Sequence, residues 1–175
     1  MHSPHHLAVD NSHVAWASAA AGGGVAIKTI SNIGSPVTLA SDQGVLAGIA
    51  IGGAYVFWSD HYNDSVTRRQ KDAGDSATTV LTVQKPSALA AKDDKLYVLS
   101  NESGTGNGDG AIWRVGFDGS AAQQLVSNIL SPNGMTVDDS YVYWTENNPP
   151  KVRRVPRAGP LCDASGAACE TLTSD

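Results

Sequence analysis

Side chains that could do chemistry gather in a few short stretches of this 175-residue chain. The densest is 59–64, where Asp60, His61 and Asp64 flank Tyr62 and Asn63. Carboxylate and imidazole groups so close together suit ligand contact or metal coordination. No partner cluster accompanies them in the sequence, so a polar exposed turn is the alternative that we favour.

A second stretch, 101–110, alternates oxygen-bearing side chains with glycine. Such a loop offers the oxygen ligands that Ca²⁺ prefers, with Glu102 and Asp109 supplying charge and Asn107 an amide. The order differs from the EF-hand spacing, and a flexible linker loop is the favoured interpretation. Calcium is therefore the one cofactor that the sequence raises, and the default expectation is none.

Two further clusters have simple explanations. His2, His5 and His6 look like metal ligands, but near a chain end we favour a disordered leader. The basic run 151–157 suggests an anion site, yet bases alternating with valine are typical of a strand with one solvated face.

Cys162 and Cys169 are the only cysteines and lie in a Gly/Ala/Ser-rich loop. A disulfide at such a hairpin tip is geometrically easy, whereas two cysteines with no nearby histidine make a poor zinc site. A disulfide predicts an extracytoplasmic location, meaning secreted, periplasmic or cell-surface.

Several function classes are disfavoured. No Ser/His/Asp order, nucleophile elbow, phosphate loop or zinc motif occurs, so an enzyme is the less favoured expectation. The formal net charge of −5 and pI near 5.4 disfavour nucleic acid as a partner. No apolar run approaches the roughly 20 residues of a membrane helix.

The elements that must position these side chains recur along the chain. An aromatic strand ends at Trp16, Trp58, Leu99 and Trp144, at spacings of 42, 41 and 45 residues. An apolar residue two before a base follows in step, in the pairs Ala26/Lys28, Val66/Arg68, Ile112/Arg114 and Val152/Arg154. A period of about 40–45 residues with short strands is typical of a β-propeller blade. We therefore predict an all-β, single propeller domain of four four-stranded antiparallel blades, at about 1–43, 44–85, 86–131 and 132–175.

The stretch from about 111 to 154 carries a family resemblance. Asp118-Gly119-Ser120, the Pro-Asn-Gly element at 132–134 and Tyr143-Trp144-Thr145-Glu146 resemble the Tyr-Trp-Thr-Asp repeat. That repeat is the class B repeat of low-density-lipoprotein-receptor propellers. The motif's acidic residue corresponds to Asp60 and, conservatively, to Glu146. The Pro-Asn-Gly element is also similar to that of NHL and gluconolactonase propellers, and this likeness implies a divalent-metal contact at Asn133.

The resemblance implies a six-bladed ring, whereas this sequence holds four repeats. Three interpretations stay open: a four-bladed monomer, a fragment of a longer propeller, or half-rings that assemble as a homo-oligomer. We favour assembly or a fragment, because an open arc exposes apolar blade faces.

Propeller geometry places the strand-two-to-three loops and the blade-to-blade loops on one face. The predicted binding residues on it are Asp60, His61, Tyr62, Asn63, Asp64, Glu102, Asn107, Asp109, Asn133, Glu146 and Asn147. Asn133, Glu102 and Asp109 are the weak metal candidates among them. We predict a secreted, non-catalytic binding or scaffold module for a protein or glycan ligand. The alternative is a metal-dependent hydrolase or lactonase of the gluconolactonase type.

Overall fold

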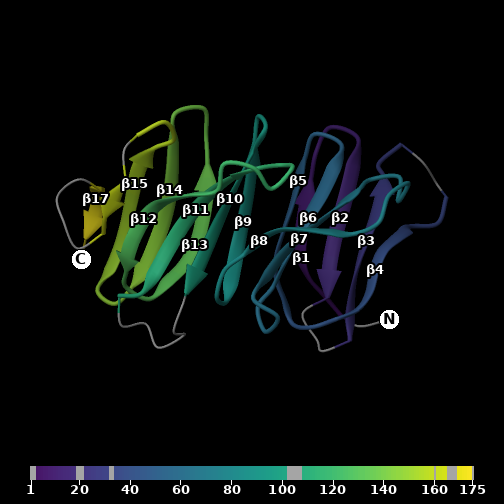
Figure 1. Ribbon diagram of the computed structural model, residues 1–175, viewed down its shortest axis with the longest axis horizontal. Helices are drawn as coiled ribbons and strands as arrows, with labels where there is room; N and C mark the ends of the chain where they lie inside the picture. Colours follow the sequence, from purple (N-terminus) through teal and green to yellow (C-terminus); the bar gives the residue numbers. More distant parts are fainter. Residues whose placement is uncertain are drawn as a thin grey trace.

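Every regular element that the structure describes is a β-strand. The computed structural model describes residues 3–18, 22–31, 34–101, 108–159, 161–164 and 169–174. Its strands form four sheets, which stand side by side as blades (Figure 1). The predicted all-β propeller fold is confirmed.

Each blade is an antiparallel meander whose strands follow one another from the inner to the outer edge. Blade 1 contains β1 (Pro4–Val9), β2 (His13–Ser18), β3 (Gly23–Thr29) and β4 (Val37–Gln43). Blade 2 contains β5 (Leu46–Gly52), β6 (Tyr55–Asp60), β7 (Ser65–Gln70) and β8 (Thr78–Thr82). Blade 3 contains β9 (Pro86–Lys92), β10 (Lys95–Asn101), β11 (Gly110–Gly116) and β12 (Gln123–Ile129). Blade 4 contains β13 (Pro132–Val137), β14 (Tyr141–Asn147), β15 (Pro150–Pro156) and β17 (Glu170–Ser174).

One strand departs from this scheme. The short strand β16 (Cys162–Asp163) follows β15 in sequence but pairs in parallel with β12 of blade 3. It makes the sheet of blade 3 five-stranded. Blade 4 therefore reaches across the outer edge of its neighbour.

The blades form an open arc. The inner strands β1, β5, β9 and β13 contact one another in that order. A Cβ on Gly48 of β5 would collide with the carbonyl oxygen of Ser87 on β9, so glycine permits this close approach of the inner strands. Blades 1 and 4 lie at opposite ends of the molecule (Figure 1), and no sheet in the described part of the chain joins them.

Apolar side chains fill each junction between blades. Trp58 is 1% exposed and packs with the side chains of blade 1, while Trp144 is 1% exposed and packs against blade 3. Trp16 is only half-buried, because the face of blade 1 that carries it has no neighbouring blade. The prediction that these tryptophans lie between blades therefore holds for Trp58 and Trp144.

Two positions of the predicted repeat are wrong by one residue. Val98 pairs with Leu89 as Trp58 pairs with Ile49, so Val98 holds the equivalent position and Leu99 faces blade 4. In blade 1 the residue equivalent to Arg68 is the buried Ile27 and not Lys28. Because side chains alternate along a strand, a shift of one residue moves the side chain to the other face.

Charged side chains clamp the junctions at the end of the blades that carries the β1–β2-type turns. Lys71 of blade 2 pairs with Asp10 of blade 1 at 2.5 Å, and Arg157 of blade 4 pairs with Asp93 of blade 3 at 2.6 Å. Burial alone would raise the pKa of Asp10, but the hydrogen bonds from Lys71, Ser12 and His13 outweigh it and hold that pKa below its usual range.

Candidate functional site

The loop face lies at the opposite end of the blades. It consists of the β6–β7 loop (61–64), the β14–β15 loop (148–149) and the connections between blades. Backbone hydrogen bonds join the two kinds of loop: the N–H of His61 donates to the carbonyl of Val45 at 2.9 Å, and that of Asn147 to Ser131 at 3.1 Å. The loop face is therefore attached firmly to the blades.

Asp60 organises this face from inside. It is 3% exposed, at the end of β6. One carboxylate oxygen accepts hydrogen bonds from the N–H of Gly44 and the amide of Asn63, both at 2.8 Å. The other accepts from the N–H groups of Tyr62 and Asn63, at 3.2 and 3.1 Å. Asp60 therefore shapes its loop from inside, and its predicted contact with a ligand stays a prediction.

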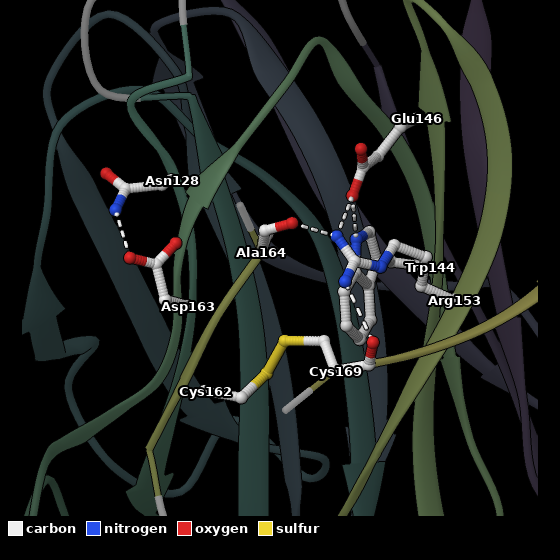
Figure 2. Close-up of a disulfide and its surroundings, with 8 residues drawn as sticks. All are labelled: Asn128, Trp144, Glu146, Arg153, Cys162, Asp163, Ala164 and Cys169. Atoms are coloured by element: carbon white, nitrogen blue, oxygen red, sulfur yellow. Dashed lines mark hydrogen bonds and ion pairs between the residues drawn. A yellow bond between two sulfur atoms is a disulfide. The ribbon is translucent and has the colours of Figure 1, made fainter. Parts of the chain in front are cut away.

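Glu146 has a similar internal role in blade 4. It is 3% exposed, and its Oε1 accepts a hydrogen bond from the indole N–H of Trp144 at 2.9 Å. The guanidinium of the buried Arg153 lies 3.6 Å from the same oxygen and also donates to the carbonyls of Ala164 and Cys169 (Figure 2). A carboxylate and a guanidinium buried together neutralise each other, so Glu146 too has a structural role, and its predicted contact with a ligand stays a prediction.

Neutral side chains remain exposed on the loop face. Tyr62 is 71% exposed, and its ring meets the edge of His61 with centroids 5.5 Å apart. Asn63, Asn133 and Asn147 are exposed as well. Asp64 is half-buried and uses Oδ1 to accept the N–H of Lys85 at 2.8 Å. Among the predicted binding residues that the structure describes, those exposed on the loop face are thus an aromatic ring and amides.

The remaining predicted residues are spread out or fall elsewhere. Glu102 and Asn107 lie outside the described residues, and Asp109 is half-buried immediately before β11. Asn133 lines a hollow of about 290 Å³ together with Asn147 and Lys151. The described part of the chain holds no group of three or more His, Cys, Asp or Glu residues able to bind a metal. Glu146 lines the same hollow, with its Oε1 bonded to Trp144 and close to Arg153, so the divalent-metal contact at Asn133 that the gluconolactonase likeness implies stays a prediction.

A second hollow lies between the inner strands, and its lining includes His5 and His6, which the sequence analysis had assigned to a disordered leader. A hollow of about 350 Å³ is lined by the inner strands of all four blades, with His5, His6, Ser87 and Asn133 as its polar members. His5 and His6 therefore belong to β1 and not to a disordered leader, whereas His2 lies outside the described residues. Burial, and next the neighbouring His5, lower the pKa of His6, against an opposing hydrogen bond with Leu46.

The predicted disulfide is present. Cys162 and Cys169 are bonded, with Cα atoms 5.6 Å apart, and both side chains are buried between blades 3 and 4 (Figure 2). The segment 161–164, which we name the outer strap, continues along β12: Asn128 donates to Asp163 at 3.0 Å, and the N–H of Ala164 to the carbonyl of Ser127 at 2.8 Å.

Curated proteins match a short part of the chain. The sortilin-related receptors of Oryctolagus cuniculus and Homo sapiens are each 53% identical over 36 residues, or 20% of this chain. The chain spans only 2% of the length of these receptors. No family model matches the sequence.

Solved structures match the fold over most of the chain. A chain of the nidogen/laminin complex has a TM-score of 0.62 at 15% identity, covering 98% of this chain and 79% of its own length. Streptogramin B lyase has a TM-score of 0.70 at 13% identity, with 96% and 53% covered. The computationally designed Ika4 protein has a TM-score of 0.62 at 14% identity, with 89% and 92% covered. Together with the receptor matches, these likenesses support the Tyr-Trp-Thr-Asp-like propeller repeat.

Proposed function

We propose that this Tyr-Trp-Thr-Asp-like propeller chain is an extracytoplasmic, non-catalytic binding module that contacts a protein or glycan ligand through its loop face. The observation that carries the proposal is the contrast between buried and exposed side chains on that face. Asp60 and Glu146 are buried and bonded within the chain, while Tyr62 is 71% exposed beside the exposed Asn63. Exposed tyrosine on a rigid support is typical of binding surfaces, because the ring supplies contact area at little cost in conformational entropy.

Other observations agree with a binding role. One chain of similar fold comes from a complex of nidogen and laminin, an assembly of proteins. The disulfide between Cys162 and Cys169 favours an oxidising compartment. No helix in the described residues is long and apolar enough to cross a membrane. Streptogramin B lyase shares the fold, so the fold alone does not decide between binding and catalysis. The internal hydrogen bonds of Asp60 and Glu146 disfavour these two carboxylates as catalytic groups of the hydrolase alternative.

The test is a ligand search with a matched variant. The labelled chain is screened against a displayed peptide library and a glycan array, and each hit is measured again with Tyr62→Ala. We expect the variant to weaken binding by at least about tenfold, as an aromatic hot spot does. Leu161→Ala, which changes another exposed apolar residue at 61% exposure, is the control and should bind normally. Hits that ignore Tyr62→Ala, or metal-dependent lactone hydrolysis by the purified chain, would contradict the proposal.

A further inference from the structure

The face of blade 1 that points away from blade 2 is apolar and uncovered. Leu7 and Val9 are 69% and 66% exposed, and Leu7 pairs with the half-buried Trp16. Beside Trp16 lies a hollow of about 350 Å³, lined also by Ala26 and Thr38. Contiguous apolar surface of this kind usually marks a contact surface.

The equivalent face of the later blades is covered by the preceding blade. In blade 2 the pair Ile49 and Trp58 corresponds to Leu7 and Trp16, and it is 7% and 1% exposed. Trp144 of blade 4 occupies the same position and is 1% exposed. The open face of blade 1 is therefore built to receive the far face of another blade.

Blade 4 exposes the complementary kind of face. Its residue Leu172 lies at the bulge of the outer strand, where Leu39, Val80 and Leu125 lie in blades 1 to 3. Those three residues are 1%, 6% and 0% exposed, since each packs towards the following blade, whereas Leu172 is 45% exposed.

A hydrogen bond from an arginine to a backbone carbonyl recurs at two internal junctions and indicates which groups meet when two blades pack together. Arg68 of blade 2 donates to the carbonyl of Phe117 in blade 3 at 2.6 Å, and Arg114 of blade 3 to that of Arg157 in blade 4 at 2.5 Å. Both acceptors are the first residue after the third strand. This hydrogen bond thus joins an arginine on the third strand of one blade to the residue that follows the third strand of the next blade.

Blade 4 has an arginine at the same position, Arg154, but no following blade of this chain supplies a carbonyl to it. Arg154 stacks on Tyr141 at 4.1 Å, as Arg68 stacks on Tyr55 at 4.3 Å, and it turns to Glu170 of its own blade. The residue of blade 1 at the acceptor position is Ile30, whose side chain is 57% exposed. A backbone carbonyl accepts the same hydrogen bond whatever its side chain, so Ile30 meets the requirement.

Two more contacts of the internal junctions have counterparts on the open faces. Phe117 packs on Phe57 with centroids 4.9 Å apart, and the residues at these two positions at the arc ends are the apolar Ile30 and the aromatic Tyr143. Arg69 donates backwards to the carbonyl of Leu39 at 2.6 Å, and the corresponding pair is Lys28 with Leu172. These aromatic, apolar and cationic positions of the internal junctions therefore each have a counterpart on the open faces of blades 1 and 4.

We propose that the open face of blade 1 binds the open face of blade 4 in a second copy of this chain. Two such head-to-tail junctions, related by a two-fold axis, close a ring from two chains of four blades each. The second copy is the occupant that we favour, because the arginine-to-carbonyl contact, the ring contact and the backward cation contact of the internal junctions have counterparts on the chain's own opposite face. The proposal is independent of the ligand on the loop face.

Light scattering of the purified chain at micromolar concentration tests the ring. The expected mass is twice the 18.1 kDa of the chain. Leu7→Glu and Leu172→Glu each place a carboxylate in one face and should each give monomers, because an unpaired charge resists burial. Mixing the two variants leaves one intact junction and should restore a one-to-one pair. Leu161→Glu, on neither open face, should stay dimeric.

Several results would overturn the proposal. A wild-type monomer means that the open faces await other blades, of a longer protein or another partner. Loss of the dimer with Leu7→Glu but not with Leu172→Glu indicates that like faces meet. Masses that grow with concentration indicate open filaments in place of a closed ring. Circular dichroism on each variant checks that the blades remain folded.

Discussion

Replacing Asp60 with alanine tests whether this carboxylate holds the loop face together. The substitution removes the acceptor of four hydrogen bonds from a side chain that is 3% exposed. The N–H groups of Tyr62 and Asn63 can turn to water, since both residues are exposed. The N–H of Gly44 is partly buried and loses its partner.

The expected cost follows from these contacts. A buried donor left without a partner costs about 1–3 kcal/mol, and each hydrogen bond to a charged group contributes about 1.5–3 kcal/mol. Allowing for rebonding of the loop to water, we expect a loss of about 3 kcal/mol in the free energy of unfolding. For a chain of this size, that corresponds to a fall of about 6–12 °C in Tm.

Urea and thermal unfolding, followed by tryptophan fluorescence, measure the effect. Asp72→Asn is the matched control: Asp72 is exposed in the same blade and accepts one local hydrogen bond, from the N–H of Gly74 at 2.9 Å. It should change stability by less than about 0.5 kcal/mol. If Asp60→Ala proves equally mild, the carboxylate is not structural, and the prediction that it contacts a ligand is favoured.

A double-mutant cycle tests the contact between Gly44 and Asp60 directly. A Cβ at position 44 would collide with the Asp60 carboxylate, so Gly44→Ala should destabilise the wild-type chain. In the Asp60→Ala background the obstacle is gone, and the same change should cost less. Additive effects would refute the direct contact.

Three other predictions follow from the described contacts. Trp58→Ala should cost about 3–5 kcal/mol in urea unfolding, because the side chain is 1% exposed between two blades; Tyr62→Ala should cost little, and equal losses would contradict the packing. A thiol assay on unreduced, denatured chain should find no free thiol, and changing Cys162 and Cys169 together to serine should cost about 2–3 kcal/mol; two reactive thiols would disprove the bond. The lowered pKa of Asp10 means that its ion pair stabilises the fold fully above about pH 4, the value near which the unfolded carboxyl titrates, and less as pH falls through the folded pKa. Asp10→Asn should remove that part of the acid sensitivity of the urea midpoint, and an unchanged pH profile would count against the pair.

The propeller could be predicted from the sequence because its signals are local. Aromatic strands at a regular period, separated by turn residues such as Asp118-Gly119, mark each hairpin without knowledge of its partners. The positive φ of 88° at Gly119 shows that the turn is built as its sequence indicates. Blade packing then follows from the large apolar side chains at 58 and 144.

The register of the repeat was harder to predict. Residues 96–99 are apolar or aromatic throughout, so no alternation reveals which side chains face blade 2 and which face blade 4. The turn at 93–94 decides, and it places Val98 rather than Leu99 opposite Leu89. A continuous apolar run fixes a strand but not its faces.

The role of the acidic residues depends on distant partners. Asp60 is bonded to Gly44, 16 residues earlier, and Glu146 lies against Arg153 from the next strand. Nothing in the local pattern distinguishes such a carboxylate from an exposed ligand. The same holds for β16, a strand of two residues: the periodicity of the sequence does not predict that it pairs with β12.

The outer strap makes the arc unequal along its length. In a chain of stacked repeats each blade is stabilised only by its neighbours, so a tie that spans two blades raises the stability of that pair alone. Blades 3 and 4 are tied by β16, by the disulfide and by the contacts of Arg153, whereas blade 1 is held from one side. In the single chain, local opening therefore starts at blade 1 and spreads towards the strapped pair, so that backbone amides of β1 exchange with solvent earlier than those of β11 and β14.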